Sequence, residues 1–216
     1  MTFYNGVFSA VLLILVLSVS GCTVLPERTA KQTFLLASPD FEASPDPLPF
    51  TLRVLTPDTE APLNGTSILV RRDNHTIQSY RGARWAKAMP LLIRDYWLGA
   101  LRQAGAFQAV IHDTSDANSH LSLISDLTAF QLEYHDGQEP GPTVVITVDA
   151  QLTESKSGDV LAARRFNVQE RAQAKPVEDL VVRFSAANRA LADELVQWAE
   201  AVSRDAFQET DQAKPL

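Results

Sequence analysis

The sequence predicts an α+β fold, in which an antiparallel sheet of about six to eight strands carries two long amphipathic helices on one face. Short runs of alternating apolar and polar residues, linked by turn-forming residues, are typical of strands with one buried face. Two longer segments, 85–104 and 177–202, instead repeat apolar residues at helical spacing. Because the strands come in runs and do not alternate singly with helices, hairpins and an antiparallel sheet are favoured.

Four strands are expected before the first helix. Prolines, four of them between residues 39 and 49, exclude regular structure from the link between the first two strands. Asp73 and Asn74 tolerate the positive φ of a two-residue turn and predict a hairpin between the third and fourth strands. The expected strands are Thr33–Leu36, Phe50–Leu55, Ser67–Arg72 and His75–Tyr80.

The first helix is expected over Trp85–Ala104. Pro90 suits a helix that begins near it, and Gly105 suits one that ends before it. Its apolar stripe comprises Trp85, Met89, Leu92, Ile93, Tyr96, Ala100 and Leu101.

Four more strands and a second helix are expected in the rest of the chain. The long run Leu121–Tyr134 changes phase, which predicts a β-bulge near Thr128–Phe130. The second helix, Val177–Val202, has its stripe at Leu180, Phe184, Ala187, Leu191, Leu195 and Trp198, and the polar tail 205–216 is expected to fray. The other three strands are Phe107–His112, Val144–Leu152 and Val160–Val168.

Composition limits the kind of partner. The 216 residues carry a formal net charge of −7, all of it after residue 21, and the sequence pI is about 5.1. This acidic balance argues against binding to nucleic acids and to anionic headgroup surfaces, which require basic patches, so no nucleic-acid partner is expected. Cys22 is the single cysteine, which excludes disulfides and a cysteine-based metal site.

The first 22 residues indicate where the protein is held. An apolar run, Phe8–Val19, is shorter than the ~20 residues of a spanning helix and leads into Val19-Ser20-Gly21-Cys22. This segment resembles the bacterial lipobox, which implies cleavage before Cys22 and acylation, as with palmitate, of Cys22. The segments would then be a signal peptide (1–21), a lipidated tether (22–32), a single domain (33–204) and the tail. No Lys or Arg precedes the apolar run, which weakens the export signal. An ordinary signal peptide, or a membrane anchor in which Cys22 is coincidental, therefore stays open as an alternative.

Catalytic motifs are absent from the sequence. It contains no Gly-x-Ser-x-Gly elbow, no His-Glu-x-x-His, no phosphate-binding glycine loop and no His pair at helical i,i+4 spacing. Glu133, His135 and Asp136 are close enough in sequence to bind a metal or move a proton, but a solvated strand end is the simpler interpretation. No catalytic residue, metal or cofactor is therefore expected.

The segment Tyr80–Pro90 joins the expected hairpin to the first helix and is the most distinctive internal element. Its candidate functional residues are Tyr80, Arg84 and Trp85. In the structural interpretation Trp85 anchors the core and Arg84 caps or pairs locally. In the alternative, the junction is an exposed site that docks a partner.

Several motifs together resemble the ABC-type transport auxiliary lipoproteins, the group that contains the paraquat-inducible C lipoproteins. They are the lipobox, Thr33-Phe34-Leu35-Leu36, Ile68-Leu69-Val70-Arg71, Tyr80 before Arg84-Trp85-Ala86, Leu101 to Phe107, and Trp198. The resemblance covers residues 33 to 200. It implies an MCE-domain protein as partner, in a conduit that carries lipid between inner and outer membrane, often with an ABC transporter. Thr23 in place of Asp after Cys22 resembles lipoproteins sorted to the outer membrane.

The sequence therefore predicts a non-enzymatic, outer-membrane-anchored periplasmic lipoprotein that assists an MCE-type lipid transport system and so supports membrane integrity. Two alternatives stay open, a structural or assembly lipoprotein of another envelope machine and a periplasmic hydrolase with a loop-built site. The sequence does not specify the transported lipid or the docking face. It also leaves open whether the protein has a hydrophobic pocket for a lipid tail and whether it forms a homo-oligomer.

Overall fold

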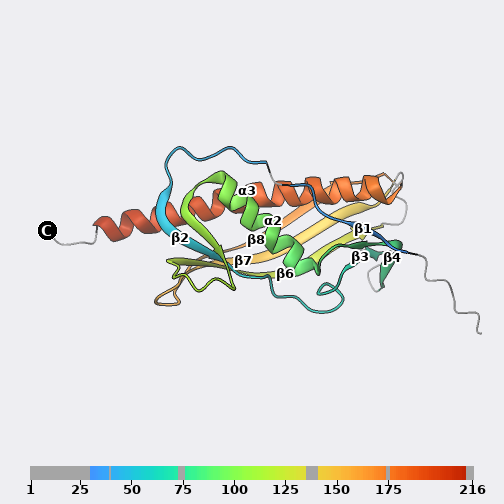
Figure 1. Ribbon diagram of the computed structural model, residues 1–216, viewed down its shortest axis with the longest axis horizontal. Helices are drawn as coiled ribbons and strands as arrows, with labels where there is room; N and C mark the ends of the chain where they lie inside the picture. The colour runs from blue at the N-terminus through green and yellow to red at the C-terminus, as the bar shows by residue number, and fades with distance from the viewer. Residues whose placement is uncertain (1–29, 39, 73–75, 135–140, 174–175, 213–216) are drawn as a thin grey trace, which may run out of the picture. The chain divides into compact units, whose positions relative to one another are not determined.

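The three longest strands are consecutive in sequence and pair antiparallel in the computed structural model (Figure 1). They are β6 (Leu121–Glu133), β7 (Thr143–Glu154) and β8 (Val160–Arg171). The structure describes residues 30–38, 40–72, 76–134, 141–173 and 176–212, with side chains described up to residue 208. The chain from Lys31 onward forms one compact unit.

The other five strands lie along the opposite edge of β6, in the order β1-β4-β3-β6-β2-β5. Four strand pairs are parallel, namely β1–β4, β2–β5, β2–β6 and β3–β6, whereas β3–β4 is an antiparallel hairpin. The strands are β1 (Gln32–Phe34), β2 (Leu48–Val54), β3 (Ser67–Arg71), β4 (Ile77–Trp85) and β5 (Phe107–His112).

One edge of β6 is shared by two strands. β2 pairs with residues 121–123 and β3 with residues 131–133, and both run parallel to β6. Between them the chain follows the same edge, because the N–H of Asp58 donates to the carbonyl of Ser125 at 2.8 Å. The Thr59 hydroxyl likewise donates to the carbonyl of Leu127 at 2.7 Å. β2 and β3 are thus successive parts of one path along β6.

This path corrects the prediction of an antiparallel sheet. The sheet is mixed, and its antiparallel part is confined to β3–β4 and β6–β7–β8. An alternating pattern reveals which face of a strand is buried, but it does not reveal which strand lies beside it. The eight strands, their order around the helices and the bulge in β6, seen as a register shift between Leu127 and Ala129, are confirmed.

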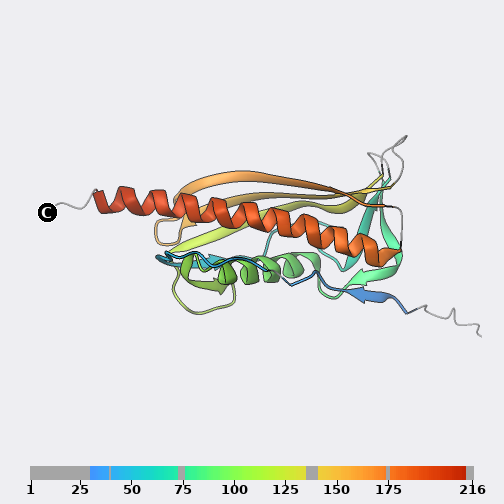
Figure 2. The same cartoon turned by 90° about the horizontal axis from the view of Figure 1, so that it is seen from above.

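Two helices, α2 (Met89–Ala104) and α3 (Val177–Gln212), lie on the same side of the long strands (Figure 2). α2 begins at Met89 and not at Trp85, because β4 continues to Trp85 and Pro90 occupies the first helical turn. It ends at Gly105, whose φ of 59° is the left-handed cap that glycine favours.

α3 extends well beyond the predicted end at Val202, so residues 205–212 of the predicted tail are helical. Its extension is packed, since the ring of Phe207 meets the ring of Phe50 on β2 edge to face at 5.5 Å. This contact joins residues far apart in sequence, which the local polar pattern of the tail did not reveal.

The core lies between the helices and the inner face of the sheet. Both predicted apolar stripes are confirmed as buried, with Trp198 only partly covered. The outer face of the sheet is polar. There Arg165 on β8 forms an ion pair with Asp149 on β7 at 2.6 Å, and Asn167 donates to the Thr147 hydroxyl at 2.7 Å. Among the described residues, no helix has both the length and the apolar character needed to cross a membrane.

Candidate functional site

The structure places three of the four candidate residues on one strand. Tyr80, Arg84 and Trp85 all belong to β4, whereas Cys22 and the tether up to residue 29 lie outside the described residues. Of the possible metal-binding trio, Glu133 ends β6, and His135 and Asp136 fall outside the described residues.

β4 is interrupted in its middle by a large bulge. Leu69 pairs with Ser79, but Ser67 pairs with Arg84, so residues 80–83 stand opposite Ile68 alone. Gly82, with a φ of 76°, supplies the left-handed conformation that this bend needs. After the bend, residues 83–85 pair with β1. Tyr80 therefore lies in the bulge, next to the half of β4 that pairs only with β3, whereas Trp85 lies in the half that also pairs with β1.

Trp85 is wholly buried at the junction. Its ring meets Phe130 of β6 at 5.7 Å and Phe184 of α3 at 5.2 Å, both edge to face, while Phe130 and Phe184 stack at 5.0 Å. Its backbone N–H donates to the carbonyl of Thr66 at 2.8 Å. A side chain enclosed in this way offers no surface to a partner and holds the sheet to α3.

Arg84 and Tyr80 are accessible. Arg84 is exposed, and its Nε donates to the Thr33 hydroxyl of β1 at 3.2 Å. Of the two local roles expected for Arg84, the structure therefore shows pairing, with a hydroxyl on the neighbouring strand β1, and not capping of a helix. Tyr80 is half-buried and lies in a pocket at the base of the bulge.

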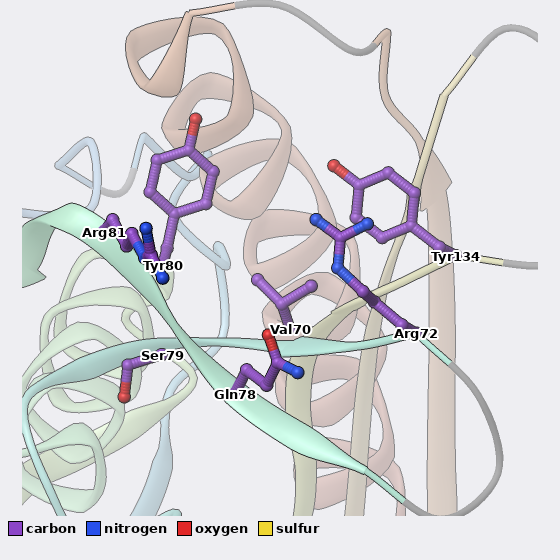
Figure 3. A pocket seen from close by; sticks show the side chains of 7 residues that line it. All are labelled: Val70, Arg72, Gln78, Ser79, Tyr80, Arg81 and Tyr134. Carbon is purple, nitrogen blue, oxygen red and sulfur yellow. The ribbon is translucent and has the colours of Figure 1, made fainter.

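This pocket, which we call the hairpin pocket, has a volume of about 520 Å³ (Figure 3). Arg72 and Tyr134 project from one side of it, and Tyr80 and Arg81 from the other. The guanidinium of Arg72 lies over the ring of Tyr134, 5.1 Å from its centroid. The lining residues are Val70, Arg72, Gln78, Ser79, Tyr80, Arg81 and Tyr134.

The hairpin pocket is cationic. Its described lining holds two arginines and no acidic residue. The neighbouring Arg71 points to the other side of β3 and pairs with Glu133 at 2.6 Å, and Gln131 also donates to Glu133 at 2.9 Å. Within the described part of the chain no ion pair neutralises Arg72 or Arg81. The pocket therefore attracts anions.

Sequence reasoning missed Arg72, Arg81 and Tyr134. Arg72 and Tyr134 become neighbours because β3 and β6 pair in parallel with Arg71 opposite Glu133. Arg81 reaches the same pocket because the bulge breaks the strict alternation of β4. No local pattern in the sequence specifies either of these features.

A separate polar network joins α2 to the ends of β2 and β5. Arg94 donates to Asp113 at 2.9 Å and to the Thr56 hydroxyl at 3.0 Å, and the Thr56 N–H and hydroxyl both donate to Asp113. Burial alone would raise the pKa of Asp113, but the hydrogen bonds from Thr56 and the charge of Arg94 outweigh it and lower that pKa.

The next residue on α2 belongs to the same network. Asp95 accepts hydrogen bonds from Lys87 at 2.6 Å and from Arg94 at 2.9 Å. Burial opposes these contacts, yet Lys87 and Arg94 together lower the pKa of Asp95. The network holds α2 against the strand ends and lies apart from the hairpin pocket.

The acidic side chains and histidines of the described residues lie apart from one another or in local hydrogen bonds. No three of their His, Cys, Asp and Glu side chains lie close enough to hold a metal ion. His120 Nδ1 accepts the N–H of Thr51 at 2.9 Å, and His112 Nδ1 is 2.7 Å from the Thr114 hydroxyl. Both histidines are thus held in local hydrogen bonds beside the loop 112–120.

Comparison with known proteins identifies the class. The sequence matches the model of the ABC-type transport auxiliary lipoprotein component family over residues 34–196. The chain belongs to that family. No match was found among curated proteins.

Two solved structures with TM-scores above 0.5 share the fold, and a third shows a weaker similarity. A crystal structure of a Xanthomonas campestris protein of the DUF330 family is 24% identical with a TM-score of 0.75, over 82% of this chain and 99% of that one. A structure of an uncharacterized protein is 17% identical with a TM-score of 0.56, over 82% and 99%. A putative lipoprotein from Caulobacter crescentus is 14% identical with a TM-score of 0.39, over 59% and 86%.

Proposed function

We propose that this protein is a non-enzymatic auxiliary component of an MCE/ABC-type lipid transport system, anchored in the outer membrane and facing the periplasm. The observation that carries the proposal is the family match over residues 34–196, preceded by a lipobox-like segment that ends at Cys22. An auxiliary component of a transporter acts on its partner proteins, which is why no reaction is assigned to it.

The proposed mechanism is positional. Two or three acyl chains on Cys22 hold a protein in a bilayer permanently, since each buried CH₂ contributes about 0.8 kcal/mol. Thr23 in place of Asp supports sorting to the outer membrane. The domain would then stand on a tether of about ten residues between Cys22 and β1, and meet the periplasmic end of an MCE-domain conduit.

The aromatic cluster of Trp85, Phe130 and Phe184 supports this mechanism, because it ties the junction rigidly to both the sheet and α3. A docking domain that positions a partner gains from such rigidity, since less conformational freedom is lost on binding. The exposed Arg84, beside the cluster, is a member of the junction that is available to a partner.

Affinity purification of the acylated protein from its own membranes tests the proposal. The protein would carry a C-terminal tag, and complexes would be cross-linked before solubilisation in a mild detergent and identified by mass spectrometry. We expect an MCE-domain protein among the partners, enriched over the same preparation from Cys22→Ser cells. Recovery of another envelope machine without any MCE-domain protein would contradict the proposal and favour an assembly role.

A further inference from the structure

We propose that the hairpin pocket binds a phosphate group, as carried by a phospholipid headgroup or by a small phosphate ester. The site is formed by Arg72, Arg81, Tyr80 and Tyr134, which β3, the bulge in β4 and the end of β6 bring together. The phospholipid source rests on the proposed function, whereas the phosphate site itself does not.

The donors present in the pocket suit a phosphate. Each guanidinium offers a planar set of N–H donors that matches two oxygens of a phosphate at once. In Figure 3 Arg72 and Tyr134 lie on one side of the cavity and Tyr80 and Arg81 on the other, so the cavity has an arginine and a tyrosine on each side. The phenolic hydroxyls and the Gln78 amide add hydrogen-bond donors to the same space.

Arg72 is held in place before any ligand arrives. Its guanidinium rests on the Tyr134 ring, which limits the rotamers open to a long, flexible side chain. An arginine that is already oriented loses less side-chain entropy when it binds an anion. This contact with the ring involves no hydrogen bond, so the N–H donors of Arg72 stay available to a ligand.

Charge and volume favour a headgroup over a lipid tail. The pocket lining contains one aliphatic side chain, Val70, beside two arginines, so an acyl chain would bury charged groups without compensation. A volume of about 520 Å³ lies within the ~300–1,000 Å³ range of small-molecule sites and exceeds the needs of a single water or ion. The net charge of −7 repels anions in general, so their capture requires a local cationic site.

Calorimetric titration of the full-length acylated protein in dodecyl maltoside tests the proposal. The probes are dihexanoyl-phosphatidylglycerol, its water-soluble headgroup glycerophosphoglycerol, and dihexanoylglycerol, which lacks the phosphate. We expect the two phosphate-bearing probes to bind and dihexanoylglycerol not to bind. Arg72→Gln and Arg81→Gln should each weaken binding about tenfold or more, because a hydrogen bond to a charged group is lost.

Arg165→Gln is the matched control. It also removes one positive charge, but from the outer face of β8, where the Arg165 side chain is 67% exposed. We expect its affinity for both phosphate probes to equal that of the wild type. Equal weakening by Arg165→Gln and the pocket variants would overturn the proposal, as would failure of the wild type to bind either phosphate probe.

Two further comparisons show whether a variant loses binding because it is unfolded, and whether the ligand is a phospholipid or a soluble phosphate ester. Arg81 is exposed in the bulge, so Arg81→Gln should melt like the wild type and keep the test valid even if Arg72→Gln is destabilised. Tighter binding of the short-chain lipid than of its headgroup supports a phospholipid, and equal binding supports a soluble phosphate ester. Because these titrations use no partner, their failure is distinct from failure of the co-purification.

Discussion

The indole ring of Trp85 meets the phenyl ring of Phe184 edge to face, with 5.2 Å between the centroids and 86° between the planes. Trp85 ends β4 and Phe184 lies in the second turn of α3, so this contact joins segments about a hundred residues apart. The junction that the sequence marks as distinctive is thereby a structural link between the sheet and the C-terminal helix.

Trp85→Ala should reduce the free energy of unfolding by about 3–5 kcal/mol, because it leaves a cavity between Phe130 and Phe184. Arg84→Lys should cost less, since Arg84 is exposed and donates a single described hydrogen bond, to Thr33. Denaturant melts of both variants give these values.

Co-purification measured on the same variants separates folding from docking. If Trp85→Ala melts like the wild type while the partner is lost, the buried-anchor interpretation is wrong. Retained stability with partner loss in Arg84→Lys would instead assign docking to the exposed arginine.

Leu191→Ala should reduce the free energy of unfolding by about 2–5 kcal/mol. Leu191 is wholly buried in the middle of the α3 stripe, where α3 packs on β7 and β8. The exposed Val182 of the same helix offers a control, because Val182→Ala removes methyl groups from a residue that is 63% exposed and should leave stability nearly unchanged. A loss below ~1 kcal/mol for Leu191→Ala would show that α3 is not part of the core.

Most of the fold could be predicted from local patterns. Strand and helix periodicities gave all eight strands and both helices in order, and the phase change in Leu121–Tyr134 located the bulge in β6. Pro90 and Gly105 located the ends of α2, because each residue restricts the backbone where it stands.

The parallel pairing of strands could not be predicted in the same way. β2 and β3 lie parallel to β6 because one irregular segment carries the chain along the β6 edge, and that segment has no periodic signal. The hairpin pocket depends on this pairing and on the bulge at Gly82, so among its described lining residues only Tyr80 was a functional candidate from the sequence.

Asp113→Asn should reduce the free energy of unfolding at pH 7 by about 1–3 kcal/mol, because the carboxylate that Arg94 and Thr56 contact is lost. The matched variant Asp149→Asn removes an exposed ion pair on the outer face of the sheet and should cost only ~0–1 kcal/mol. Urea melts at pH 7 compare the two.

The same carboxylate predicts a pH dependence with a defined sign. The pKa of Asp113 is lower in the folded protein than the ordinary value of 3.8, so the unfolded chain binds more protons as the pH falls below 3.8. Its stabilising contribution is therefore complete above that pH and is lost as the pH falls through the folded pKa. Asp113→Asn should lose less stability than the wild type on acidification, and an equal loss would contradict the role given to Asp113.

Attachment through Cys22 is the claim on which the proposed function depends, and membrane fractionation with labelled palmitate tests it most directly. The wild type should incorporate label and sediment with the outer membrane after a high-salt wash. Cys22→Ser should incorporate none, and it should appear as released or signal-retained protein. Cys22→Ser protein that still fractionates with the outer membrane after the wash would contradict lipid anchoring at this residue.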